Sequence, residues 1–186
     1  MATTGAVELA RAELRQGIAE HIFPAAVAEV GDRRSPLWRE AFGSLTFDGH
    51  AVRADEGTIF DLASLAKPLA TTSVVMHLAA DRRLTIDDSV RLFFGEWRGE
   101  DREAVTIRDL LEHASGLPAR LLDGPPDGRR EFEHDICTLP FEYAPRTQAV
   151  YSDLGFILLG FLVADRGEAS LKTQFERIAR DRKSVV

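Results

Sequence analysis

Ser64 and Lys67 lie three positions apart at the start of an apolar segment. Residues at this spacing share one face of a helix, so the lysine amine would lie beside the serine hydroxyl. The helix N-terminus and burial would both lower the pKa of the lysine. A neutral amine there accepts the serine proton, and the serine oxygen then attacks a carbonyl carbon to form an acyl-enzyme. The pair therefore predicts nucleophilic hydrolysis.

The same tetrapeptide has a second interpretation, in which Ser64 caps a helix and Lys67 is a surface side chain. The sequence around Lys67 is too apolar for a surface helix, which favours the catalytic interpretation. Pro68 agrees with a helix that begins at about Ser64, because proline is tolerated in the first turn of a helix.

Residues 64–81 are predicted to form the helix that carries the pair. The segment is apolar on nearly every side, which is typical of a helix buried at the centre of its domain. Before it, charges alternate with apolar residues at helical spacing in 5–20, which predicts an amphipathic helix. Residues 23–31 and 37–47 read as the two strands of a hairpin.

The second half of the chain is predicted to be mainly helical. Thr106 caps a helix that runs to about His113, and Asp109 completes an acidic variant of the capping box. Residues 154–163 form a nearly all-apolar helix. The Asp-Gly-Pro-Pro-Asp-Gly run at 123–128 predicts a loop.

Composition limits the classes of partner. The 186 residues suffice for one domain with a core, and the net charge of −7 gives no basic surface for nucleic acid or anionic lipid. No apolar run reaches the roughly 18 residues of a membrane span, and the N-terminus lacks the pattern of a signal peptide. We therefore expect a cytoplasmic protein that binds neither nucleic acid nor membrane.

Four blocks of the sequence resemble the β-lactamase and penicillin-binding-protein superfamily of serine hydrolases. They read FDLASLAK at 60–67, LTIDDSV at 84–90, TIRDLLEHASGLP at 106–118 and YSDLGF at 151–156. The blocks occur in the order and at the spacing found in that family, and the resemblance extends over about residues 20–178. It implies an α+β, β-lactamase/transpeptidase-like fold, in which helices flank an antiparallel sheet and a helical lobe is added.

The resemblance also implies the domain organisation and the reaction. Residues 1–180 would form one domain, with the hairpin and nucleophile helix in 1–80 and the helical lobe in 81–165. The activity would be serine hydrolysis through an acyl-enzyme, on the ester, amide or β-lactam carbonyl of a small molecule and without a cofactor. The alternative is a non-catalytic ligand-binding module of the same fold.

Carried over from the family, Ser64 is the nucleophile and Lys67 its base partner. Tyr151 passes the proton to the leaving group or, as a phenolate near Lys67, is itself the base; the residues leave both possibilities open. The Ser64 backbone N–H supplies one oxyanion donor. Asp153 stands where the family usually has asparagine, and an ionised carboxylate only accepts hydrogen bonds.

Asp153 therefore changes two expectations. Its charge would hold Lys67 protonated, which moves the role of base toward Tyr151. It also removes a donor for the acyl-amide side chain of a penicillin-like substrate. Asp153 is thus expected to contact the substrate and to favour a simple ester or an amine-bearing substrate over a β-lactam.

A third element of the family, a K-T-G-like triad on a late strand, is not matched in this chain. Residues 172–174 read Lys-Thr-Gln, but they lie in a stretch predicted as helical, 171–179, and glutamine replaces the glycine needed for close backbone approach. We expect the chain to be C-terminally truncated and inactive by itself. Residues 181–186 follow no helical or strand pattern and are expected to be a non-native tail.

Several other residues of reactive type are assigned structural roles. His113 falls in the last turn of its helix, where a positive charge suits the helix dipole, and Gly116 ends that helix with positive φ. Ser115 lacks the surroundings of a nucleophile elbow. His77 is a lone histidine in a buried helix, and Cys137 is a small core residue. No spacing of ligands predicts a metal site.

Overall fold

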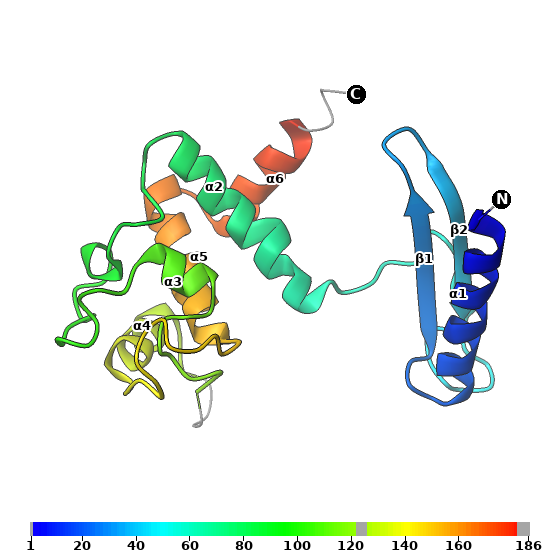
Figure 1. Ribbon diagram of the computed structural model, residues 1–186, viewed down its shortest axis with the longest axis horizontal. Coiled ribbons are helices and arrows are strands. Elements are labelled where there is room, and N and C mark those ends of the chain that lie inside the picture. The colour runs from blue at the N-terminus through cyan, green and yellow to red at the C-terminus, as the bar shows by residue number, and fades with distance from the viewer. Residues whose placement is uncertain (1, 122–125, 182–186) are drawn as a thin grey trace. The chain divides into compact units, whose positions relative to one another are not determined.

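The computed structural model of the protein describes residues 2–121 and 126–181. The chain divides into two compact units, Met1–Asp61 and Leu62–Val186 (Figure 1). The first three residues of the predicted loop at 123–128 and most of the predicted tail at 181–186 lie outside the described residues. The proposed boundaries at residues 80 and 165 stay predictions.

The first unit consists of one helix and a two-stranded antiparallel hairpin. Helix α1 (Ala2–Ala19) packs on strand β2 (Pro36–Gly43), which pairs with β1 (Ala25–Gly31) (Figure 1). The Arg11 guanidinium forms a 2.5 Å ion pair with Glu40 between the helix and β2. The helix and the hairpin were both predicted from the sequence. The second strand ends earlier than predicted, at Gly43.

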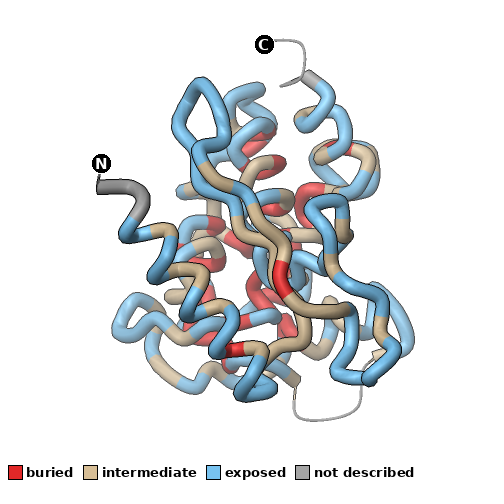
Figure 2. The backbone as a smooth tube through the Cα atoms, turned by 90° about the vertical axis from the view of Figure 1, so that its right-hand side faces the viewer, coloured by how far each residue is buried: buried red, intermediate tan, exposed pale blue. Residues whose placement is uncertain are grey.

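The regular elements of the second unit are helices and helical turns in its described residues, joined by loops and one isolated β-bridge between Ser89 and Thr106. Figure 2 shows that the buried positions of the chain concentrate in this unit, whereas the hairpin strands are mostly of intermediate exposure. Its elements in chain order are a 3₁₀ turn Ala63–Leu65, a π-helix Lys67–Thr72, α2 Ser73–Ala80, a 3₁₀ turn Val90–Leu92, α3 Ile107–Leu111, α4 Arg129–Thr138, α5 Asp153–Gly167 and α6 Leu171–Asp181.

Helix α5 is the centre of the core. Among its side chains, Leu158, Leu159 and Val163 are fully buried, and the helix contacts α2, α3, α4 and α6. Cys137 of α4 is also buried, and desolvation raises the pKa of its thiol to about 12. This confirms its prediction as a core residue. No helix in the described ranges is both long and apolar enough to cross a membrane.

The predicted helix at 64–81 is present as three consecutive elements, and its predicted burial holds for one side only. Val74, Val75 and Leu78 are buried against the core, but Leu69 and Met76 are exposed within the described chain. Apolar side chains on all sides show what could be buried. They do not say which neighbours cover each side.

The capping box of α3 is confirmed, but the helix is shorter than predicted. Thr106 and Asp109 exchange side-chain-to-backbone hydrogen bonds, and the helix ends at Leu111. His113 follows it with a left-handed φ of +58°. Gly116 has the predicted positive φ, +93°, but it lies in the loop beyond the helix and not at its end.

Gly116→Ala is expected to destabilise the protein by about 2 kcal/mol, because φ is strained for alanine. The new Cβ would also lie 2.7 Å from the Tyr143 carbonyl oxygen. Gly160→Ala is the matched control, since that helical position has open space around it. The control should stabilise by up to about 1 kcal/mol. Urea unfolding of both variants measures the difference, and equal midpoints would contradict the expected strain.

Candidate active site

Ser64 lies in the 3₁₀ turn that precedes the π-helix, directly after Ala63, whose φ is +44°. The Lys67 ammonium donates a 3.1 Å hydrogen bond to the Ser64 hydroxyl oxygen. The π-helix begins at Lys67 with Pro68 in its first turn, and the Thr72 hydroxyl donates to the Lys67 carbonyl at 3.0 Å. The local sequence thus brings serine and lysine side chains into direct contact, as their spacing predicted.

Tyr151 and Asp153 reach the same place from the N-terminal end of α5. Asp153 Oδ1 lies 2.7 Å from Lys67 Nζ, and the Tyr151 ring centroid lies 4.9 Å from the same nitrogen. Three of the four residues that the sequence singled out, Ser64, Tyr151 and Asp153, therefore surround the ammonium group of the fourth, Lys67. The Lys67 side chain is only 16% exposed, whereas that of Asp153 is 53% exposed.

The electrostatics of the group depart from the first expectation for Lys67. Burial lowers the pKa of Lys67, but Asp153 and Tyr151 outweigh burial and raise it overall. This direction favours the protonated amine expected from Asp153 over the neutral amine expected from burial alone. The Lys67 ammonium, and then the Ser64 hydroxyl, lower the pKa of the Tyr151 phenol.

A cavity of about 520 Å³ opens over these residues. Its lining is largely apolar with a few polar side chains, among them Ser64 and Lys67, which is the pattern of a small-molecule site. The residues that line it are Leu62, Ser64, Leu65, Lys67, Pro68, Thr72, Leu111, His113, Tyr151 and Phe156.

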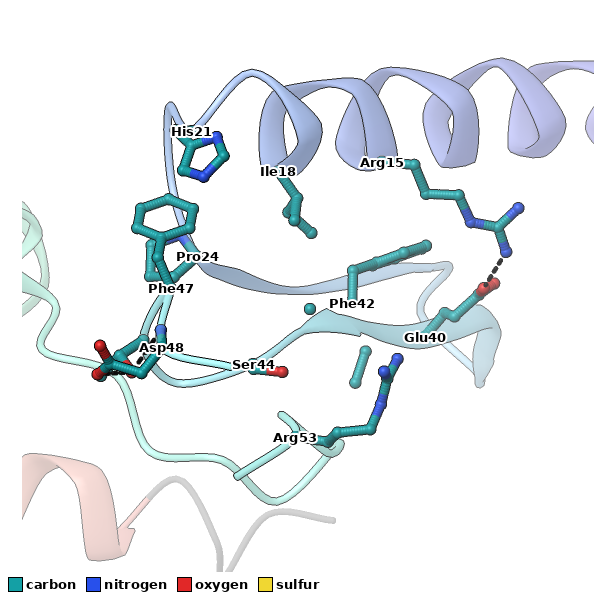
Figure 3. A pocket seen from close by; sticks show the side chains of 13 residues that line it. Arg15, Ile18, His21, Pro24, Glu40, Phe42, Ser44, Phe47, Asp48 and Arg53 are labelled. Atoms are coloured by element: carbon teal, nitrogen blue, oxygen red, sulfur yellow. Dashed lines mark hydrogen bonds and ion pairs between the residues drawn. The ribbon is translucent and has the colours of Figure 1, made fainter. Parts of the chain in front are cut away.

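A second cavity, of about 660 Å³, lies in the first unit between α1, β2 and the loop that follows (Figure 3). Arg15 points toward Glu40 across it, 3.6 Å apart, and the His21 ring stacks on Phe47. Arg15 is thus paired with Glu40, and Asp48 accepts a 2.7 Å hydrogen bond from the Thr46 hydroxyl. The combination of nucleophile and amine belongs to the cavity of the second unit.

His113 lines the cavity, although its position in the sequence predicted only a structural role at a helix end. Its Nδ1 accepts a 3.0 Å hydrogen bond from the Ser152 N–H. Burial, and then Lys67, lower the pKa of its ring. The expected positive charge at the end of α3 is therefore wrong. The proximity of His113 to Tyr151 depends on two segments about 40 residues apart, which spacing in the sequence does not reveal.

The other residues of reactive type lie away from the cavity. His77 is exposed beside Asp81, so its predicted burial is wrong. Ser115 is buried, and its oxygen accepts from the Leu117 N–H. Gln174 lies in helix α6, which confirms the prediction that residues 172–174 are not a triad on a strand. Its buried amide donates to two backbone carbonyls. The described residues contain no cluster of three histidine, cysteine or acidic side chains suited to a metal.

Comparison with known proteins places this geometry in a family. The protein of Escherichia coli strain K12 named "Putative D-alanyl-D-alanine carboxypeptidase" is 29% identical over 147 residues, which are 68% of this chain and 34% of that protein. The chain spans about one third of the length of the curated relatives it matches first.

Solved structures show the same fold. The octameric penicillin-binding protein homologue from Pyrococcus abyssi is 21% identical with a TM-score of 0.77, over 92% of this chain and 41% of that one. A class C β-lactamase solved in complex with cefoxitin is also 21% identical with a TM-score of 0.77, over 93% of this chain and 48% of that one. The predicted β-lactamase/transpeptidase-like, α+β fold is thereby confirmed.

The Beta-lactamase family model matches residues 10–182, which include the four blocks singled out in the sequence and the whole of the cavity around Ser64. The chain belongs to the Beta-lactamase family, whose members are serine hydrolases.

Proposed function

We propose that Ser64 is the nucleophile of a serine hydrolase that forms an acyl-enzyme. The observation that carries the proposal is the cluster around Lys67 Nζ, which lies 3.1 Å from Ser64 Oγ and 2.7 Å from Asp153 Oδ1 beneath the Tyr151 ring. An activated nucleophile needs a base within hydrogen-bond reach and a third group that orients the base. In this proposal Ser64 is the nucleophile, Tyr151 is the base and Lys67 is the group that orients the base.

Tyr151 is the base in this proposal, because Asp153 and Tyr151 keep Lys67 protonated and an ammonium cannot accept a proton. Lys67 instead lowers the pKa of Tyr151 and stabilises its phenolate. The phenolate takes the Ser64 proton as Ser64 Oγ bonds to the carbonyl carbon. The resulting phenol then gives that proton to the leaving group as the bond to the leaving group breaks. Water releases the acyl group in a second step with the same proton transfers.

The substrate class is a carbonyl compound of low molecular weight: an ester, an amide or a β-lactam. The family and the name of the E. coli relative support this class for the chain. The exposed carboxylate of Asp153, 2.7 Å from the Lys67 amine that lines the cavity, favours esters or amine-bearing substrates. A carboxylate accepts hydrogen bonds from an amine but cannot donate one to an amide carbonyl.

Asp153→Asn should raise the ratio of β-lactam to ester hydrolysis several-fold, because an asparagine amide donates to the acyl-amide group of a penicillin. The ratio is measured as kcat/KM for a penicillin over kcat/KM for a short aryl ester. Asp165→Asn, at the far end of α5, is the control and should leave the ratio unchanged. An unchanged or lowered ratio in Asp153→Asn would place Asp153 out of contact with the substrate.

A non-catalytic binding module is the second candidate, supported by the open cavity with its largely apolar lining. Hydrolysis of a short aryl ester by the protein expressed from its complete gene distinguishes the two. Turnover that depends on Ser64 supports the hydrolase, and saturable binding of the ester without turnover supports the module.

Residues 1–186 alone are proposed to be inactive toward such an ester, unlike the product of the complete gene. Leu65, Leu69 and Met76, which flank the site on the nucleophile segment, are exposed within the described residues. An exposed apolar face of this kind favours association over a stable monomer. The test is size-exclusion chromatography and ester turnover, measured on residues 1–186 and on the product of the complete gene. The same oligomeric state and the same turnover in the two forms would contradict this proposal.

A further inference from the structure

The backbone on both sides of Tyr151 is hydrogen-bonded to the loop that follows α3. The Val150 N–H donates to the His113 carbonyl at 3.0 Å, and the Ser152 N–H donates to His113 Nδ1 at 3.0 Å. The residues on either side of Tyr151 thus both hydrogen-bond to His113. The connection continues beyond them, since the Asp153 N–H donates to the Ala119 carbonyl at 2.8 Å.

The His113 ring also packs against the side chain that it would position. Its centroid lies 4.7 Å from that of Tyr151 and 5.1 Å from that of Phe156. The left-handed backbone at His113, with φ of +58°, and the Tyr143 hydroxyl, which donates to the His113 carbonyl at 3.0 Å, support this arrangement. The ring therefore has one place to lie, between the Tyr151 segment and α5.

We propose that His113, neutral and protonated on Nε2, is the positioning residue that holds Tyr151 over Lys67 through the Ser152 N–H. The inference rests on the proposed function, in which Tyr151 is the base. His113 touches neither the serine nor the reacting carbonyl. Its Nδ1 must be an acceptor, because the Ser152 N–H can only donate.

The arrangement has a consequence for pH. A proton on Nδ1 would face the Ser152 N–H and break the hydrogen bond. The titratable groups around the ring are Lys67 from the π-helix, Tyr151 from the preceding loop and Asp153 from α5, with Tyr143 at the carbonyl. As the pH falls through the lowered pKa of His113, Tyr151 should lose its position and the reaction of Ser64 should slow.

Two variants and a control test whether the hydrogen-bond acceptor of His113 or the bulk of its ring positions Tyr151. His113→Asn keeps an acceptor oxygen near the place of Nδ1, and asparagine tolerates left-handed φ. His113→Leu keeps bulk but has no acceptor. His77→Asn removes an exposed histidine far from the cavity and is the matched control.

The readout is the rate at which a fluorophosphonate labels Ser64, measured against pH in the protein expressed from its complete gene. His113→Leu should slow labelling by about 10-fold or more, since small misplacements of a catalytic group have effects of this size. His113→Asn should stay within about 3-fold of the unchanged protein. It should also lose the part of the acid slowing that follows the pKa of His113, because asparagine does not titrate, and keep the part that follows protonation of Tyr151. Equal slowing in the Asn and Leu variants, or none in either, would overturn the proposal.

Nitrogen-15 NMR of the histidine rings tests the same inference without activity and without a variant that must fold. The expected spectrum shows His113 protonated on Nε2 and unprotonated on Nδ1. The opposite tautomer would overturn the proposal. If Ser64→Ala labels as fast as the unchanged protein, the proposed function fails, and the NMR result still decides the hydrogen bond to Ser152.

Discussion

Ser64→Ala is expected to reduce hydrolysis of a short aryl ester by about 10³-fold or more, because members of a nucleophile–base unit act together. Alanine has no oxygen with which to attack the carbonyl, so the covalent route is lost. Lys67, Tyr151 and Asp153 would remain in place around an empty position. Since they need the serine oxygen to act on, the remaining cavity would supply binding alone.

The measurement is kcat/KM for the ester, at equal protein concentration and with near-UV circular dichroism to show an intact fold. Ser73→Ala, nine residues farther along the same helical segment, is the matched control and should keep full activity. Retained turnover in Ser64→Ala would remove Ser64 from the role of nucleophile. Loss in both variants would indicate damage to the segment and not to the chemistry.

Arg146→Met should destabilise the protein by about 3 kcal/mol, at the low end of the range for breaking a buried ion pair. Asp109 has a side chain only 3% exposed, and the Arg146 guanidinium reaches it with two hydrogen bonds of 2.8 Å. Removing the guanidinium leaves a buried carboxylate with only its Thr106 partners. The loss lies at the low end because the Arg146 side chain is itself 55% exposed, and water screens the pair.

The effect should depend on pH in a defined direction. Burial raises the pKa of Asp109, but Arg146 and Thr106 outweigh it and lower the pKa overall. A carboxyl group whose pKa is lowered in the folded state contributes stability above its unfolded pKa of about 3.9 and loses it as the pH falls through the folded value. The difference in free energy of unfolding between Arg146→Met and the unchanged protein should therefore be full at pH 7. It should become smaller at about pH 4 and below.

Urea unfolding at pH 7 and at low pH measures this gap. Arg108→Met is the control. Arg108 lies on the same helix as Asp109, and its guanidinium pairs with Asp87 at 2.8 Å on the surface. Exposed pairs contribute up to about 1 kcal/mol, so the control should change stability little. A gap of equal size at both pH values would contradict the role of the Asp109 charge.

Local patterns predicted the parts of the site that lie within one turn of chain. The contact between Ser64 and Lys67 follows from helical spacing, and the capping box follows from Thr106 and Asp109 three positions later. Asp153 was identified as the partner that keeps Lys67 protonated only through the resemblance to a family. Its 2.7 Å approach to Lys67 joins segments 86 residues apart.

What could not be predicted depends on neighbours distant in the sequence. The balance of burial and charge on Lys67 needs the position of Tyr151, and the neutral ring of His113 needs the Ser152 N–H. The π-helix is a local feature that the helical pattern did not indicate. Pro68, which has no N–H, and the Thr72 hydroxyl, which donates to the Lys67 carbonyl, both lie within it.

The most direct test of the central claim is to label the nucleophile covalently and locate the label. The protein is incubated with a fluorophosphonate, digested and analysed by mass spectrometry, in parallel with Lys67→Met and Tyr151→Phe. The account predicts one covalent adduct, on the peptide that contains Ser64 and at the Ser64 oxygen, with labelling slowed in both variants. An adduct on any other residue would contradict it. So would labelling of Ser64 at the rate of the unchanged protein in both Lys67→Met and Tyr151→Phe.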